Sequence, residues 1–106
     1  MATDLNNLAV LLQTQGDYAG AEPLYRRALA IDEKALGLEH PDVATDLNNL
    51  AGLLQTQGDS AGAERLYRRA LAIAEKALGP DHPSTKTIRS NLDALQPTSG
   101  EAVQKQ

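Results

Sequence analysis

Ala2-Thr3-Asp4-Leu5-Asn6-Asn7-Leu8-Ala9 is the stretch that decides the fold, because the same eight residues return in the same order as Ala44 to Ala51. Aligning residues 2–43 with residues 44–85 leaves 34 of 42 positions identical. The eight differences are Val10/Gly52, Tyr18/Ser60, Pro23/Arg65, Asp32/Ala74, Leu38/Pro80, Glu39/Asp81, Asp42/Ser84 and Val43/Thr85. A period of about 20 to 50 residues is typical of stacked-repeat proteins, in which each unit buries its apolar face only against its neighbours.

Leu and Ala recur at helical spacing through both repeats, which predicts helices over about 2–15, 18–36, 41–57 and 60–78. A fifth helix is expected from His82-Pro83 to about residue 95. In the turns Gly16-Asp17 and Gly58-Asp59, glycine suits a left-handed helix end and the aspartate suits the N-cap of the next helix. We therefore expect an all-α fold of five helices that pair as antiparallel hairpins.

The expected organisation is a repeat array over residues 1–96 followed by a disordered tail over 97–106. The first repeat covers 2–39, the second covers 40–81, and a C-terminal capping helix covers 82–96. In that last helix Arg89, Asp93 and Gln96 stand where the repeats carry apolar residues, whereas Leu92 and Leu95 stay apolar toward the preceding repeat, as a solvated cap requires. No cap precedes the first helix, so we expect an open repeat face at the N-terminus.

Composition and charge exclude several kinds of partner and site. With 10 basic and 14 acidic residues the net charge is −4, without the basic patch that nucleic-acid binding requires. The absence of cysteine excludes disulfides and thiolate metal sites. No apolar run reaches membrane-spanning length and the N-terminus lacks a signal-peptide core. We expect a cytoplasmic protein with no nucleic-acid and no membrane partner.

Five segments keep their spacing in both repeats. In the second repeat they read His40-Pro41-Asp42-Val43-Ala44, Leu47-Asn48-Asn49-Leu50-Ala51, Gln57-Gly58-Asp59, Ala63-Glu64-x-Leu66-Tyr67-x-Arg69-Ala70-Leu71 and Glu75-Lys76-Ala77-Leu78-Gly79. On these segments the chain, over about residues 2–95, resembles the tetratricopeptide repeats, specifically the 42-residue subtype of kinesin light chains and their microbial relatives. The resemblance implies a right-handed superhelical solenoid of antiparallel helix pairs. It also implies a concave groove, lined by the first helix of each pair, that binds a peptide or partner protein without catalysis or a cofactor.

The groove candidates are the residues of each first helix that do not face its partner helix. They are Thr3, Asn6, Asn7, Val10, Gln13, Thr45, Asn48, Asn49, Gly52, Gln55, Thr87, Ser90 and Asn91. Asparagine is unfavourable within a helix, so the recurrence of Asn7, Asn49 and Asn91 at one register needs a compensating role. These amides either bond to the main chain of an extended peptide or bond between neighbouring helices and hold the stacking register. In the kinesin light chains, an asparagine matching Asn7 and Asn49 contacts the main chain of the cargo peptide.

The chain departs from the light chains at their basic groove positions. Thr3 and Thr45 stand where that family has a lysine. Asp32 and Ala74 stand where it has an arginine. We therefore expect a neutral groove lined by amides, suited to main-chain recognition with weak sequence preference.

The remaining charged and aromatic motifs have structural interpretations. Asp32 and the pairs Arg26-Arg27 and Arg68-Arg69 are expected on solvated faces, the arginines pairing with nearby acidic residues. His40 and His82 each precede a helix-starting proline, so a capping or packing role is expected, with catalysis or metal binding as the alternative. Tyr25 and Tyr67 are expected in the core with their hydroxyls at the rim. We expect no catalytic residue and no metal.

Two functions fit the pattern. One is a scaffold that binds an extended peptide or partner protein in the groove. The other is a self-assembly unit, or the C-terminal piece of a longer array, that associates through the open N-terminal face and so forms a homo-oligomer.

Overall fold

The computed structural model describes residues 2–95. It contains α1 (Ala2–Thr14), α2 (Tyr18–Leu36), α3 (Pro41–Thr56), α4 (Ser60–Leu78) and α5 (Pro83–Leu95). The expected helix ends are confirmed to within one residue, and residues 2–95 contain no strand. Gln96 of the expected cap and the expected tail, 97–106, lie outside the described residues.

The turn within each hairpin follows the residues that predicted it. Gly16 and Gly58 have φ of 86° and 89°, a left-handed conformation that glycine adopts without strain. Asp17 accepts a hydrogen bond from the backbone N–H of Gly20 at 2.9 Å, and Asp59 makes the same bond one repeat later. Each aspartate thus satisfies a donor that the helix start leaves unpaired.

The loops that precede α3 and α5 are capped by histidine. His40 Nδ1 accepts from the backbone N–H of Asp42 at 3.0 Å, and His82 Nδ1 accepts from that of Ser84 at 3.0 Å. Pro41 occupies the first turn of α3, where a missing N–H costs nothing. The expected capping role of both histidines is confirmed.

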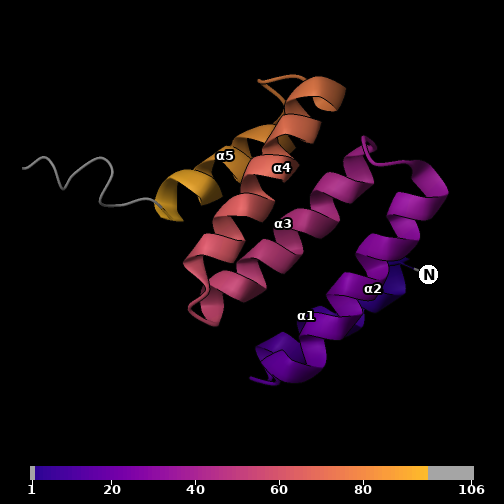
Figure 1. Ribbon diagram of the computed structural model, residues 1–106, viewed down its shortest axis with the longest axis vertical. Coiled ribbons are helices and arrows are strands. Elements are labelled where there is room, and N and C mark those ends of the chain that lie inside the picture. Colours follow the sequence, from indigo (N-terminus) through magenta and orange to yellow (C-terminus); the bar gives the residue numbers. More distant parts are fainter. Residues whose placement is uncertain (1, 96–106) are drawn as a thin grey trace, which may run out of the picture.

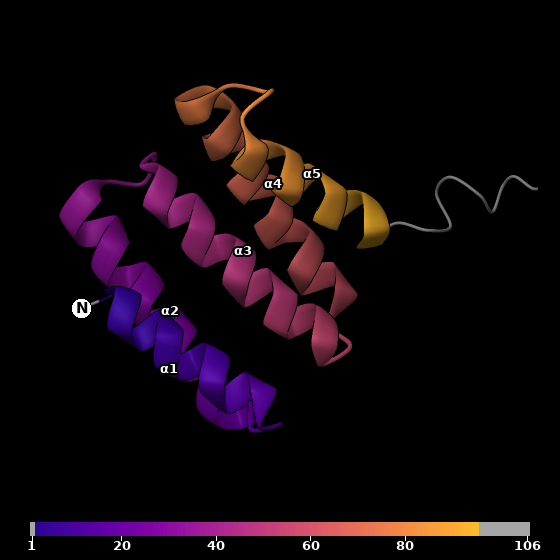
Figure 2. The ribbon, with the colours of Figure 1, turned by 180° about the vertical axis from the view of Figure 1, so that it is seen from behind.

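The helices lie in two layers. Figure 2 looks onto the face made by α1, α3 and α5, and Figure 1 looks onto the opposite face, where α2 and α4 lie in front. Each helix packs against the next one along the chain, as in a solenoid. The surface shared by α1, α3 and α5 is called the A face below.

α3 carries two apolar stripes. Leu50 and Leu53 are fully buried against Ala21 and Tyr25 of the preceding hairpin. Ala51 and Leu54 face the other way, into a cluster formed with α4 and α5. A central helix of the stack is therefore covered from both sides, and this position in the stack determines which residues are buried.

α5 is apolar on one side only. Ile88 and Leu92 are 4% and 7% exposed and pack against the second repeat. Arg89, at the register of the buried Leu47, is instead paired with Glu75 at 3.1 Å. Polar residues thus cover the outer side of the last described helix.

Candidate functional site

Three of the A-face asparagines hold neighbouring helices together. Asn6 Nδ2 of α1 donates to Asp46 Oδ1 of α3 at 2.8 Å. Asn91 Nδ2 of α5 donates to Asn48 Oδ1 of α3 at 3.0 Å. Of the two interpretations given for Asn7, Asn49 and Asn91, Asn91 thus follows the one in which the amide holds the stacking register. Asn6 and Asn48 make bonds of the same kind, each joining residues about one repeat apart.

Asn7 and Asn49 behave differently. They share the register of Asn91, but neither side-chain amide has a hydrogen-bond partner among residues 2–95. Asn7 is exposed and Asn49 is half-buried. The three asparagines at this register, Asn7, Asn49 and Asn91, are called the asparagine ladder below, and two of its amides are therefore free to donate to and accept from a bound main chain.

The expectation that Gln13 and Gln55 do not face the partner helix is wrong, because both side chains link the two helices of their hairpin. The hydroxyl of Tyr25 donates to Gln13 Oε1 at 2.8 Å, and that of Tyr67 donates to Gln55 Oε1 at 3.0 Å. Burial raises the pKa of both tyrosines, so these hydroxyls keep their protons and remain donors. The tyrosines lie in the core and their hydroxyls reach polar partners, as expected.

The other groove candidates are small or exposed. A Cβ built on Gly52 would lie 3.7 Å from the hydroxyl of Tyr67, whereas the matching Val10 is 49% exposed. Thr45 donates to a backbone carbonyl of its own helix at 3.4 Å. Exposed positions without such a bond are Thr3, Thr87 and Ser90.

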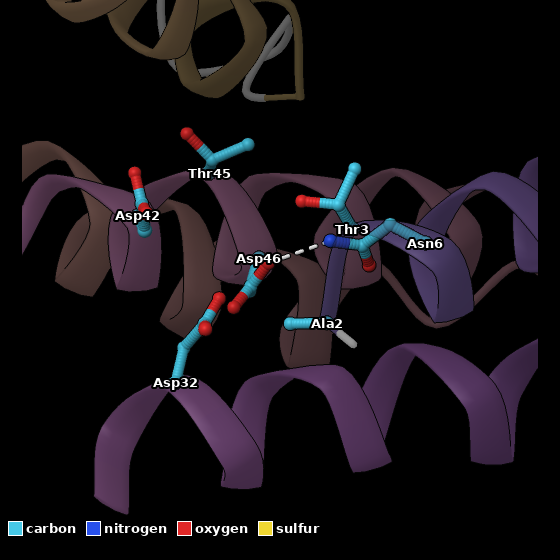
Figure 3. A pocket seen from close by; sticks show the side chains of 7 residues that line it. All are labelled: Ala2, Thr3, Asn6, Asp32, Asp42, Thr45 and Asp46. Carbon is cyan, nitrogen blue, oxygen red and sulfur yellow. Dashed lines mark hydrogen bonds between the residues drawn. The ribbon is translucent and has the colours of Figure 1, made fainter. Parts of the chain in front are cut away.

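A pocket of about 240 Å³ opens where α1, α2 and α3 meet (Figure 3). Its polar lining combines the groove candidates Thr3, Asn6 and Thr45 with the carboxyls of Asp32, Asp42 and Asp46. We call it the first junction pocket. Figure 3 shows the carboxyls of Asp32 and Asp46 turned toward one another, with the Asn6 amide on the other side of Asp46.

Asp46 has an unusual environment for a carboxyl group. Its side chain is only 2% exposed, and Oδ2 has no donor within residues 2–95. Desolvation, together with a hydrogen bond to Asp32 and the negative charges of Asp32 and Asp42, raises the pKa of Asp46 to about 7. The bond from Asn6 acts in the opposite direction. Near neutral pH a proton shared by the two carboxyls supplies the donor that Oδ2 otherwise lacks.

Two expectations are wrong at this pocket. The A face is not neutral here, because three carboxyls line the same hollow as the threonines and the amide. Asp32 does not lie on a solvated outer face but is half-buried beside Asp46. The signal was present in the sequence, since Asp32/Ala74 and Asp42/Ser84 are two of the eight differences between the repeats.

A second pocket of about 250 Å³ lies one repeat further on, between α3 and α5. We call it the second junction pocket. It is lined by Thr45, Asn48, Pro83, Ser84, Thr87 and Ile88. Ser84 and Ile88 stand one period after Asp42 and Asp46, so this pocket has lost the carboxyls of the first.

Three of the four arginines in the two arginine pairs contact acidic residues, as expected, whereas Arg27 has no ion pair within residues 2–95. Arg26 pairs with Glu22 and Arg68 with Glu64, each at 2.8 Å across one helical turn. Arg69 pairs with Glu33 at 2.7 Å and so joins α4 to α2. Because these arginines are paired within the chain, they give no indication of an anionic partner.

Within residues 2–95 no cluster of three or more histidine, aspartate or glutamate side chains has an arrangement that could hold a metal ion. None of the described helices combines the length and apolarity needed to cross a bilayer.

Comparison with known proteins places these features in a family. The family model described as tetratricopeptide repeat matches residues 1–76 and again 47–95. A search of curated proteins gave no match.

Two solved structures are similar over nearly the whole chain. BtubC (BKLC) from P. vanneervenii superposes with a TM-score of 0.84 at 26% identity, over 94% of this chain and 39% of that one. The TPR-like repeats of a Podosopora anserina protein described as a kinesin light chain give 0.81 at 28% identity, over 92% of this chain and 46% of that one. The chain thus spans less than half the length of these relatives. Their similarity confirms the helical solenoid and its kinesin light chain-like repeats.

Proposed function

The chain belongs to the tetratricopeptide repeat family, and from that membership we propose that it is a non-catalytic scaffold that binds an extended peptide or partner protein along the A face. Repeats of this family are generally protein-interaction modules. The described helices of a solenoid present a continuous surface, which suits a ligand that crosses several of them.

The observation that carries the proposal is the pair of free amides, Asn7 and Asn49. Asparagine weakens a helix interior, and these two side chains make no hydrogen bond within residues 2–95 that would offset the cost. Each can donate to a carbonyl and accept from an N–H of an extended chain. Successive amides on α1 and α3 would therefore recognise the main chain of a peptide lying across both helices.

The test begins with selection of binders from a random-peptide display library. The selected peptides are then titrated against the wild type and Asn49→Ala. We expect Asn49→Ala to weaken binding about fivefold to tenfold, the effect of losing one or two hydrogen bonds. Arg26→Ala, on a helix outside the A face, is the matched control and should leave affinity unchanged. A library that yields no binder, or binders indifferent to Asn49→Ala, would contradict the proposal.

A second function is supported by a different observation. Leu8 and Leu11 of α1 are 46% and 52% exposed, whereas Leu50 and Leu53 at the same registers of α3 are fully buried. The α1 stripe thus matches the surface that α3 buries against the preceding hairpin. We infer that it associates with a second copy or a further helix pair, and that the chain then acts as an assembly unit.

Light scattering over a concentration series tests this association. It predicts a mass that rises above the 11.3 kDa of one chain, and Leu8→Gln should reduce the rise without loss of helical circular dichroism. A mass that stays at one chain at every concentration would exclude self-association through this surface.

A further inference from the structure

The first junction pocket gathers negative charge that nothing nearby balances. No lysine or arginine within residues 2–95 contacts Asp32, Asp42 or Asp46. His40 Nδ1 lies 3.9 Å from Asp42 Oδ1, but that nitrogen accepts the backbone N–H of Asp42 and does not donate to the carboxylate. The carboxyls therefore face the pocket without a counter-ion from the described chain.

Two buried acceptors in this pocket have no amide, hydroxyl or cationic donor. Asp46 is 2% exposed, and among the described residues its Oδ2 has only the proton that it shares with Asp32, which a bound cation would replace. The amide oxygen of Asn6, whose nitrogen donates to Asp46 Oδ1, has no donor among the described residues. A buried acceptor without a donor destabilises the folded state, so a group that brings N–H donors to this point would bind favourably.

The second junction pocket shows that the fold does not need these carboxyls. It occupies the equivalent place one repeat later and has almost the same volume, 250 against 240 Å³. Ser84 and Ile88 replace Asp42 and Asp46 in its lining, and the buried Ala74 stands one period after Asp32. α3 still packs against α5 through the apolar Ile88. The acidic set is thus a feature of one junction only, and packing of the repeats does not account for it.

Resting on the proposed function, we propose that the first junction pocket binds the ammonium or guanidinium group of a lysine or arginine side chain carried by the segment that occupies the A face. Asp46 and Asp32 accept hydrogen bonds from the cation, and Asp42 adds negative charge at the side of the pocket. The pocket is polar and half-open to solvent, which suits the charged end of a long side chain whose stem stays outside. A peptide bound through Asn7 and Asn49 would pass beside it, since Asn6 lies next to Asn7 on α1.

The direct test uses two small probes and amide NMR spectra of the full chain. N-acetyl-lysine methylamide carries the ammonium, and N-acetyl-norleucine methylamide is the neutral control with the same main chain. The lysine probe should shift the amides of residues 42–46 and 3–6, while Ser84 to Ile88, at the second junction pocket, should not move. Shifts from the norleucine probe of the same size, equal shifts at both pockets, or no shift with either probe would each overturn the proposal.

Variants taken from the chain's own second repeat complete the test. Asp32→Ala and Asp42→Ser introduce the residues that the second junction already tolerates, so the fold should persist, as helical circular dichroism will show. We expect Asp32→Ala to weaken the lysine probe about fivefold to tenfold, as loss of a partly buried charge-assisted bond should. An unchanged affinity in a folded Asp32→Ala would contradict the assignment.

Different results would contradict the scaffold function and the cation pocket. If no peptide is selected, only the scaffold function is contradicted, because the lysine probe still reports on the pocket. Conversely, selected peptides that need Asn49 but show no enrichment of lysine or arginine would leave the scaffold intact and exclude the cation pocket.

Discussion

Asp46→Asn is expected to raise the free energy of unfolding at alkaline pH and to change it much less in mild acid. An asparagine at this position resembles the protonated acid, because its oxygen can accept from Asn6 while its nitrogen donates to Asp32. The variant therefore keeps the hydrogen bonds of the junction at every pH, whereas the wild type loses its shared proton as the pH rises.

The magnitude follows from the pKa of Asp46, which burial and Asp32 raise from 3.8 to about 7. Between these values the folded protein holds a proton that the unfolded chain has released, so stability falls as pH rises and levels off above about 7. From pH 5 to the folded pKa is roughly two pH units, each equivalent to about 1.36 kcal/mol. The wild type should therefore lose roughly 2 to 3 kcal/mol relative to Asp46→Asn between pH 5 and pH 8.

Urea unfolding followed by circular dichroism at pH 5 and pH 8 measures this difference. Comparing each variant with the wild type at each pH cancels any pH dependence of stability that all of these proteins share. Asp4→Asn is the matched control, because Asp4 stands at the same register of α1 and is exposed. If Asp46→Asn and the wild type lose stability in parallel, or if Asp4→Asn gives the same gain, the account of the buried carboxyl is wrong.

Three further substitutions test the packing. Thr85 is fully buried, its hydroxyl has no partner among residues 2–95, and the matching residue is Val43. Thr85→Val should therefore raise the free energy of unfolding by about 1 kcal/mol, and an unchanged or lower value in urea unfolding would contradict this. Asp59→Ala removes an N-cap and should lower the free energy of unfolding by about 1 kcal/mol, seen as a lower midpoint of thermal unfolding. An unchanged midpoint would show that the cap does not stabilise the fold. Tyr67→Phe leaves the oxygen of Gln55 accessible to water, so it should cost only about 0.5 to 1.5 kcal/mol in the same experiment, and a larger loss would show that the hydroxyl has a further role.

The helices could be predicted from the sequence because their signals are local. Gly16 and Asp17 lie next to each other and end one helix while starting the next, whatever the rest of the chain does. Pro41 similarly marks the start of α3 without reference to distant residues. Such signals recur one period later, which is why the repeat and its hairpins were predictable to within a residue.

Burial of the site could not be predicted in this way. Asp4 and Asp46 stand in identical eight-residue stretches, yet Asp4 is exposed and Asp46 is buried. Leu8 and Leu50 differ in the same manner. The environment of each residue is set by the hairpin that precedes it in the stack, and identical local sequence carries no information about that neighbour.

The partners of the asparagines depend on the same long-range geometry. Asn91 reaches Asn48 on the neighbouring helix, while Asn49 at the same register of its own helix has no partner among residues 2–95. The sequence placed both on one ladder and left open whether the ladder serves stacking or binding. In the structure the two residues differ, because Asn91 bonds to the neighbouring helix whereas the Asn49 amide remains available to a ligand.

Chemical-shift mapping with a peptide from the display selection would show whether an extended partner lies along the A face. We expect the shifted amides to cluster on α1 and α3 around Asn7 and Asn49, and the shifts to be smaller for Asn49→Ala at the same subsaturating peptide concentration. Shifts confined to α2 and α4, or to the stripe of Leu8 and Leu11, would contradict this expectation and place the binding surface elsewhere on the solenoid.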